Sequence, residues 1–122
     1  MPDISYGVSL SINKENLSSQ INVSNVTANM DVAGLRSVTY TLTTNATSIS
    51  TANLSKVGLA FLRNLSTSTI ATAQIGIDAG GSFLAFTTLR PGEPQVFRLT
   101  AGVDYEAIGV SGTRLRVDIT EG

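Results

Sequence analysis

Short runs of alternating apolar and polar residues, spaced about ten residues apart, cover most of this chain. Between Ser5 and Ile12 every second residue is apolar, and Ser37–Thr43 repeats the pattern with threonine on the polar side. Alternation with a period of two places apolar side chains on one face of a β-strand and polar side chains on the other. No long stretch shows the 3.6-residue period of a helix, so the pattern predicts an all-β chain.

Turn-forming residues separate these runs. Asp78-Ala79-Gly80-Gly81-Ser82 predicts a hairpin turn, and Arg90–Pro94 predicts a second firm turn. Residues 64–69 are expected to form a polar turn, 28–35 a connection with room for a brief helical turn, and 45–53 a polar loop that Ile49 anchors to the core. Strands are expected over residues 5–12, 20–26, 37–43, 56–63, 70–78, 83–89, 95–100, 105–110 and 114–120.

Eight or nine short strands at this spacing are typical of an antiparallel β-sandwich. We expect one sandwich domain over residues 1–122, with the jelly-roll and immunoglobulin-like arrangements both open. A chain of 122 residues is long enough to bury a core without disulfides.

Composition removes most catalytic chemistry. The chain has no histidine, cysteine or tryptophan, which excludes a disulfide framework and the side chain best suited to proton transfer near neutral pH. A serine or threonine nucleophile needs a base, and the two lysines, Lys14 and Lys56, lie in no recognisable motif. We therefore expect no enzymatic activity, no catalytic residues and no cofactor.

The charge pattern bears on partners. The net charge is −1 and the arginines are dispersed, so we expect no nucleic-acid binding. No apolar run approaches the roughly 20 residues of a membrane span, and Met1-Pro2-Asp3 does not begin a signal segment, so no membrane association is expected. A surface with so little charge and a mean hydropathy of +0.19 favours association with other proteins, including further copies of the chain.

Two groups of charged residues were considered as ligand sites. Asp104 and Glu106 share one strand face, where two solvated charges are a better interpretation than a metal site, because calcium draws on more oxygens from a tight loop. Asp78 with the glycines that follow it leads into a strand rather than a helix, which favours a hairpin turn over a phosphate-binding loop. No metal site is therefore expected.

Three arginines are candidates for a partner interface. Arg114 and Arg116 alternate with apolar residues, and Arg98 lies between Phe97 and Leu99. One interpretation is a docking strip of guanidinium groups. The other is an ordinary outer sheet face, with cross-strand ion pairs to acids such as Glu106 or Asp118.

The last two-thirds of the chain carries a further pattern of core and turn positions. It runs through Val57-Gly58-Leu59-Ala60-Phe61-Leu62-Arg63-Asn64-Leu65, Ile75-Gly76-Ile77, Phe83, Leu89-Arg90-Pro91-Gly92-Glu93, Phe97-Arg98-Leu99, Tyr105-Glu106-Ala107 and Leu115-Arg116-Val117-Asp118-Ile119-Thr120-Glu121-Gly122. This pattern resembles small all-β structural proteins of the virions of tailed bacteriophages.

The resemblance implies a non-enzymatic virion subunit made in the bacterial cytoplasm. It also makes Arg63, together with Arg98, a candidate for the partner interface or for pairing within the sheet. The subunit would be a capsid decoration (cement) protein or a head-tail or tail accessory protein. Its partners would be other virion proteins, such as the major capsid or tail proteins, and further copies of itself. An alternative from another class is a carbohydrate-binding or adhesin-like β-sandwich, which commonly stacks sugars on exposed aromatic rings. The three tyrosines and four phenylalanines lie almost entirely at apolar strand positions, which counts against that alternative.

Overall fold

The computed structural model describes residues 2–122 and contains ten β-strands and no helix among them. The all-β prediction is thus confirmed. Met1, where the search for a signal segment began, lies outside the described residues. The strands are β1 (Ile4–Lys14), β2 (Leu17–Ala28), β3 (Leu35–Thr41), β4 (Thr47–Ser48), β5 (Val57–Asn64), β6 (Ala73–Ala79), β7 (Ser82–Leu89), β8 (Pro94–Arg98), β9 (Tyr105–Gly109) and β10 (Arg114–Glu121).

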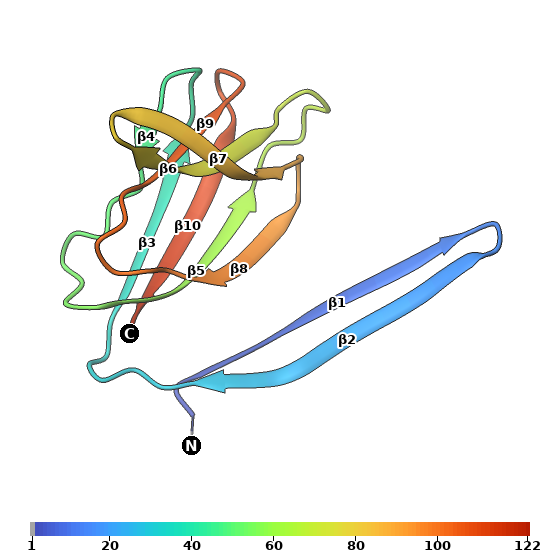
Figure 1. Cartoon of the computed structure of the whole chain (residues 1–122), viewed down its shortest axis with the longest axis horizontal. Helices are drawn as coiled ribbons and strands as arrows, with labels where there is room; N and C mark the ends of the chain where they lie inside the picture. The colour runs from blue at the N-terminus through green and yellow to red at the C-terminus, as the bar shows by residue number, and fades with distance from the viewer. Residues whose placement is uncertain (1) are drawn as a thin grey trace. The chain divides into compact units, whose positions relative to one another are not determined.

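These strands belong to two compact units. The first, up to Asp31, is a hairpin in which β1 pairs only with β2, and the second runs from Val32 to Gly122 (Figure 1). Two of the strands that the sequence analysis placed in the sandwich therefore form a sheet of their own. We call this hairpin the arm.

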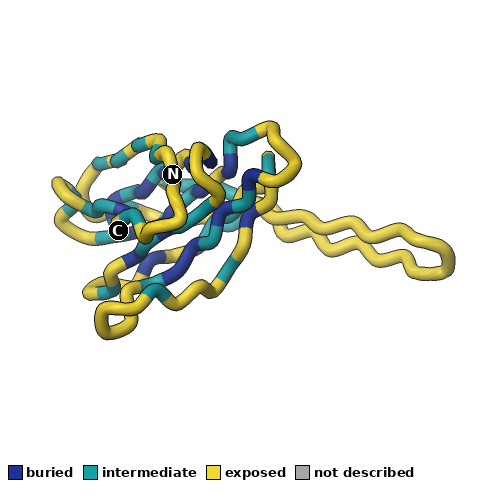
Figure 2. The backbone as a smooth tube through the Cα atoms, turned by 90° about the horizontal axis from the view of Figure 1, so that it is seen from above, coloured by how far each residue is buried: buried dark blue, intermediate teal, exposed yellow. Residues whose placement is uncertain are grey.

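The second unit is a β-sandwich of two four-stranded antiparallel sheets. One sheet has the order β3-β10-β5-β8 and the other the order β4-β9-β6-β7. The chain crosses from one sheet to the other at every connection except the β6–β7 hairpin. Apolar side chains from both sheets meet between them, and Figure 2 shows the buried backbone concentrated there. The core consists of Leu42, Ile49, Ala60, Leu62, Ala73, Ile75, Leu89, Leu99, Tyr105, Ala107, Leu115, Val117 and Ile119.

Local expectations hold in most places. Ile49 is buried, and its N–H donates to the Tyr105 carbonyl at 2.8 Å, so it anchors the 45–53 loop as predicted. Gly80 and Gly81 adopt positive φ angles in the predicted β6–β7 hairpin turn, where Gly81 N–H donates to the Asp78 carboxylate. Two expectations were wrong. No helical turn lies between β2 and β3, and the polar loop contains a tenth strand, β4, which pairs with β9.

Asn64 ties three parts of the sandwich together from a fully buried position at the end of β5. Its side-chain amide donates to the carbonyls of Ala71 at 2.7 Å and Leu89 at 3.1 Å, and its side-chain oxygen accepts from Ser66 N–H at 3.0 Å. Asn64 was predicted to be the first residue of a polar turn. It is instead a core residue whose polar atoms are all satisfied by hydrogen bonds within the fold.

Glu121 is a second buried polar anchor, at the end of β10. Its carboxylate accepts from Ser55 N–H at 2.7 Å, from the Ser55 hydroxyl at 3.0 Å and from Lys56 N–H at 3.1 Å. The backbone N–H groups of Lys56 and Ser55 lower the pKa of Glu121 below its ordinary value of 4.5, because they stabilise the charged form more than burial penalises it. Glu121 is therefore ionised at neutral pH and fixes the start of β5 to the end of the chain.

Candidate interaction surfaces

The arm carries an apolar face that is open to solvent. In the β1–β2 register Val8 lies opposite Val23 and Leu10 opposite Ile21, and residues directly opposite each other share a face of the sheet. The same face continues through Ile12, which lies opposite Ser19, to Leu17, which lies opposite Lys14 next to the hairpin turn. Its exposed aliphatic side chains, from 37% exposed at Ile12 to 61% at Leu17, are Val8, Leu10, Ile12, Leu17, Ile21 and Val23.

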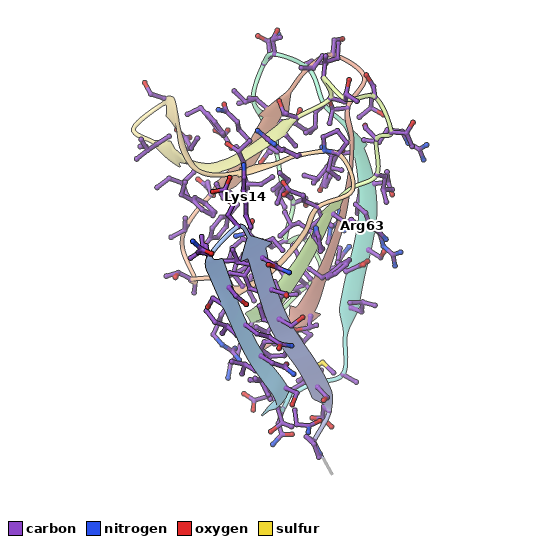
Figure 3. The ribbon with its side chains drawn as sticks, turned by 90° about the vertical axis from the view of Figure 1, so that its right-hand side faces the viewer. Lys14 and Arg63 are labelled. Atoms are coloured by element: carbon purple, nitrogen blue, oxygen red, sulfur yellow. The ribbon has the colours of Figure 1, made fainter. Side chains whose placement is uncertain are left out.

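The opposite face of the arm is polar throughout. It presents Ser5, Gly7, Ser9, Ser11 and Asn13 from β1 and Ser18, Gln20, Asn22 and Thr27 from β2. Figure 2 shows the arm exposed along nearly its whole length, and Figure 3 labels Lys14 at its turn. The arm is thus amphipathic, although none of the sandwich strands pairs with it.

Such a hairpin is unusual for a protein that acts alone. Isolated two-stranded hairpins are at best marginally stable in water. A contiguous exposed apolar patch of several hundred Å² marks a surface that binds something else. At eleven and twelve residues the arm strands are also longer than the usual five or six. We define the apolar arm face as the six aliphatic side chains named above.

The four arginines that the sequence singled out lie together on the sandwich. Leu115 and Val117 are buried, so their neighbours Arg114 and Arg116 point to the outside of the β3-β10-β5-β8 sheet. Arg63 lies directly opposite Arg116 in the β5–β10 register. Arg98 lies opposite Leu59 on the same side of the sheet. We call this outer surface the arginine face.

The charge on the arginine face is unbalanced. All four guanidinium side chains are exposed, and Asp118 is the one carboxylate among the outward-pointing residues of the four described strands. Arg116 Nε donates to Asp118 Oδ2 at 2.9 Å, whereas Arg63 Nε reaches only the Gly92 carbonyl, at 3.3 Å. Like charges directly opposite each other, as at Arg63 and Arg116, destabilise a sheet unless a counter-charge is supplied.

The expected cross-strand ion pairs were wrong in detail. The Arg116–Asp118 pair runs along a single strand rather than between strands, because residues i and i+2 share a face. Glu106 lies on β9 in the other sheet, away from the arginine face. The second Asp118 oxygen, Oδ1, is buried without a hydrogen-bond partner among the described residues.

The remaining charged candidates, Asp78, Asp104 and Glu106, lie in different settings. Asp78 is occupied by the hairpin turn, as predicted. Glu106 is partly buried on β9, and Asp104 is exposed and precedes that strand. Across residues 2–122 no group of three or more acidic side chains has a geometry that could hold a metal ion.

Aromatic side chains cluster at one open edge of the sandwich. Phe86 of β7 packs edge-on against Phe97 of β8, with ring centroids 5.6 Å apart, and against Tyr105 at 6.3 Å. Phe86 is 47% exposed and is the single aromatic residue of the described chain that is largely open to solvent. The cluster covers the core where the two sheets separate, which is a packing role.

The sequence matches no model of a known protein family and no curated protein. Among residues 2–122 there is no helix long and apolar enough to pass through a lipid bilayer. The apolar arm face and the arginine face are the two surfaces of the described residues that bear on function.

Proposed function

We propose that this chain is a non-enzymatic structural subunit that works by docking onto other protein subunits. The assembly that fits its sequence pattern is the virion of a tailed bacteriophage, where it would be a capsid decoration or head-tail accessory protein. The single observation that carries the proposal is the apolar arm face, a row of exposed aliphatic side chains on a two-stranded sheet.

The arm supports assembly because its stability and solubility both improve when its apolar face is covered. Burying apolar surface contributes roughly 25 cal/mol per Å², and the opposite face remains polar and suited to water. Neither an enzyme nor a free-standing binding module requires such a hairpin. A subunit held among neighbouring subunits can bury the apolar face of the hairpin against them.

The arginine face supports the same proposal independently. Exposed guanidinium groups are common at protein interfaces, because the planar fork binds carboxylates in a bidentate manner. Arg63 and Arg116 lie directly opposite each other and share their sheet face with one carboxylate, Asp118, so an acidic partner surface would offset the remaining positive charge. Arg63, Arg98, Arg114 and Arg116 are therefore proposed as a second partner contact.

The strand order adds a weaker line of support. Eight strands that change sheet at every connection but one favour the jelly roll over the immunoglobulin-like alternative, in which several consecutive strands share a sheet. Jelly rolls recur in viral capsid proteins, and also in lectins. The carbohydrate-binding alternative gains little from this, because Phe86, the largely exposed ring, is engaged by two other rings.

The experiment is a count of this chain in particles purified from the host that encodes it. Peptide mass spectrometry with isotope-labelled standards gives its copy number relative to the major shell protein. The proposal predicts a fixed ratio that survives density-gradient purification and a wash in high salt. A chain that is expressed but missing from the particle fraction contradicts it.

A further inference from the structure

The apolar arm face needs a partner surface of matching length and composition. The seven strand positions from Val8 to Lys14, at about 3.4 Å each, make a strip roughly 24 Å long. Exposed apolar residues on the described part of the sandwich occur instead in separated pairs: Val32 with Leu35, Ile70 with Val110, and Leu84 with Phe86. The outer sheet face that bears the arginines would bury unpaired guanidinium groups beneath aliphatic side chains, at a large desolvation cost.

Among the surfaces of residues 2–122, a second arm is the one that fits. We propose that two copies associate by stacking their apolar arm faces against each other about a two-fold axis. The hairpin turn of each arm (the tip) then lies over the opposite end (the base) of the other arm. This inference rests on the proposed function and names its first partner as a second copy. The result is a small two-layer sandwich of four strands, with every exposed aliphatic residue of the arms inside and both polar faces outside.

Charge favours the tip-to-base direction. The tip carries Lys14 and Glu15, whose charges offset each other, whereas the base carries the carboxylates Asp3 and Asp31. Stacking in opposite directions keeps the acidic bases of the two copies at opposite ends. Stacking in the same direction would gather all four base carboxylates at one end.

The area involved is sufficient for a specific contact. The six aliphatic side chains, each about half exposed, present on the order of 500 Å² of apolar surface. Two such faces pressed together remove on the order of 1,000 Å² from water, which is the threshold for a specific interface. The two-fold axis would pass near the middle of β1, where Leu10 of one copy meets the equivalent residue of the other.

Cross-linking tests this geometry cleanly, because the natural chain has no cysteine. The test uses the full-length variants L10C, S9C and L17C, a short bis-maleimide reagent, and light scattering of the unmodified chain. A bis-maleimide is needed because opposed sheets pack about 10 Å apart, beyond the reach of a disulfide. Circular dichroism first establishes that each variant keeps the β-sandwich.

The proposal predicts a mass twice the 12.7 kDa of one chain and rapid cross-linking of L10C to itself. It also predicts at least tenfold slower cross-linking of S9C, on the polar face, and of L17C, whose copies lie at opposite ends. Fast L17C self-cross-linking overturns the tip-to-base arrangement. A monomeric mass in light scattering at every concentration overturns pairing with a second copy. It does so whatever else covers the apolar arm face. Copy counting in particles tests the proposed function separately.

Discussion

Glu121 accepts hydrogen bonds from both the backbone N–H and the hydroxyl of Ser55, a residue 66 positions earlier in the chain. Together with a third bond from Lys56 N–H, this contact closes the sandwich where β5 begins and β10 ends. It also links the stability of the sandwich to pH, since the three donors prefer the ionised carboxylate.

The pKa of Glu121 is lower in the folded chain than its ordinary value of 4.5. Its stabilising contribution is therefore complete above about pH 4.5 and is lost as the pH falls through the lower folded value. Thermal unfolding of E121Q is expected to occur at a lower temperature than wild type at pH 7, with the difference shrinking below pH 4.5. E106Q, on the outer side of β9, serves as the matched control and should shift little. A difference that stays constant from pH 7 to pH 3 would rule out this linkage.

Replacing Asn64 should be among the most destabilising single changes. N64L removes three hydrogen bonds and leaves the carbonyls of Ala71 and Leu89 buried without a donor. We expect a loss of about 2–4 kcal/mol in the free energy of unfolding, measured by urea denaturation. N64D, which keeps the size but cannot donate to both carbonyls, should also lose stability. N45A, at an exposed loop position, should change the free energy of unfolding by less than about 0.5 kcal/mol. Equal losses at positions 64 and 45 would show that Asn64 does not anchor the core.

The two facing arginines should respond in opposite ways. R63S removes the positive charge opposite Arg116 and gives up only a long hydrogen bond, so the isolated chain should keep or slightly raise its stability. R116S removes the ion pair to Asp118 and should cost about 0.5–1 kcal/mol. Chemical denaturation in low and moderate salt measures both, and salt should narrow the gap between the variants. If R63S is the more damaging of the two, the repulsion argument is wrong.

Removing the arm should leave the sandwich intact. Because β1 and β2 pair with no other strand and residues from Val32 onward form a compact unit, a chain lacking residues 1–30 should fold alone. Its unfolding midpoint should lie within a few degrees of the full chain measured at high dilution. It should remain monomeric at concentrations at which the full chain associates. A truncated chain without cooperative unfolding would show that the arm belongs to the folding unit.

Alternation along the chain was enough to predict nine of the ten strands and most of the turns. It could not distinguish a strand that packs on its own domain from one that awaits a different surface. Val8 and Leu10 have the same spacing as Val38 and Tyr40, yet only the second pair faces a core. The distinction depends on which strands pair, and strand pairing is a long-range property.

The register between strands explains which side chains the sequence could and could not be predicted to bring together. The sequence places Arg114 and Arg116 on one face, but only the alignment of β5 with β10 brings Arg63 opposite Arg116. Asn64 was predicted to begin a polar turn, whereas its hydrogen bonds to Ser66, Ala71 and Leu89 hold it in the core. No local signal identifies Ala71 and Leu89, 7 and 25 positions further along the chain, as its partners.

The most direct test of the account is whether the apolar arm face carries the chain into an assembled particle. Particles made without this chain would be incubated with wild type, with L10E on the apolar face, and with S9E on the polar face. The chain that sediments with the particles is then quantified. The account predicts that wild type and S9E bind to the same copy number and that L10E loses at least ninety per cent of binding. Binding of L10E at the wild-type level, or no binding by wild type, would contradict it.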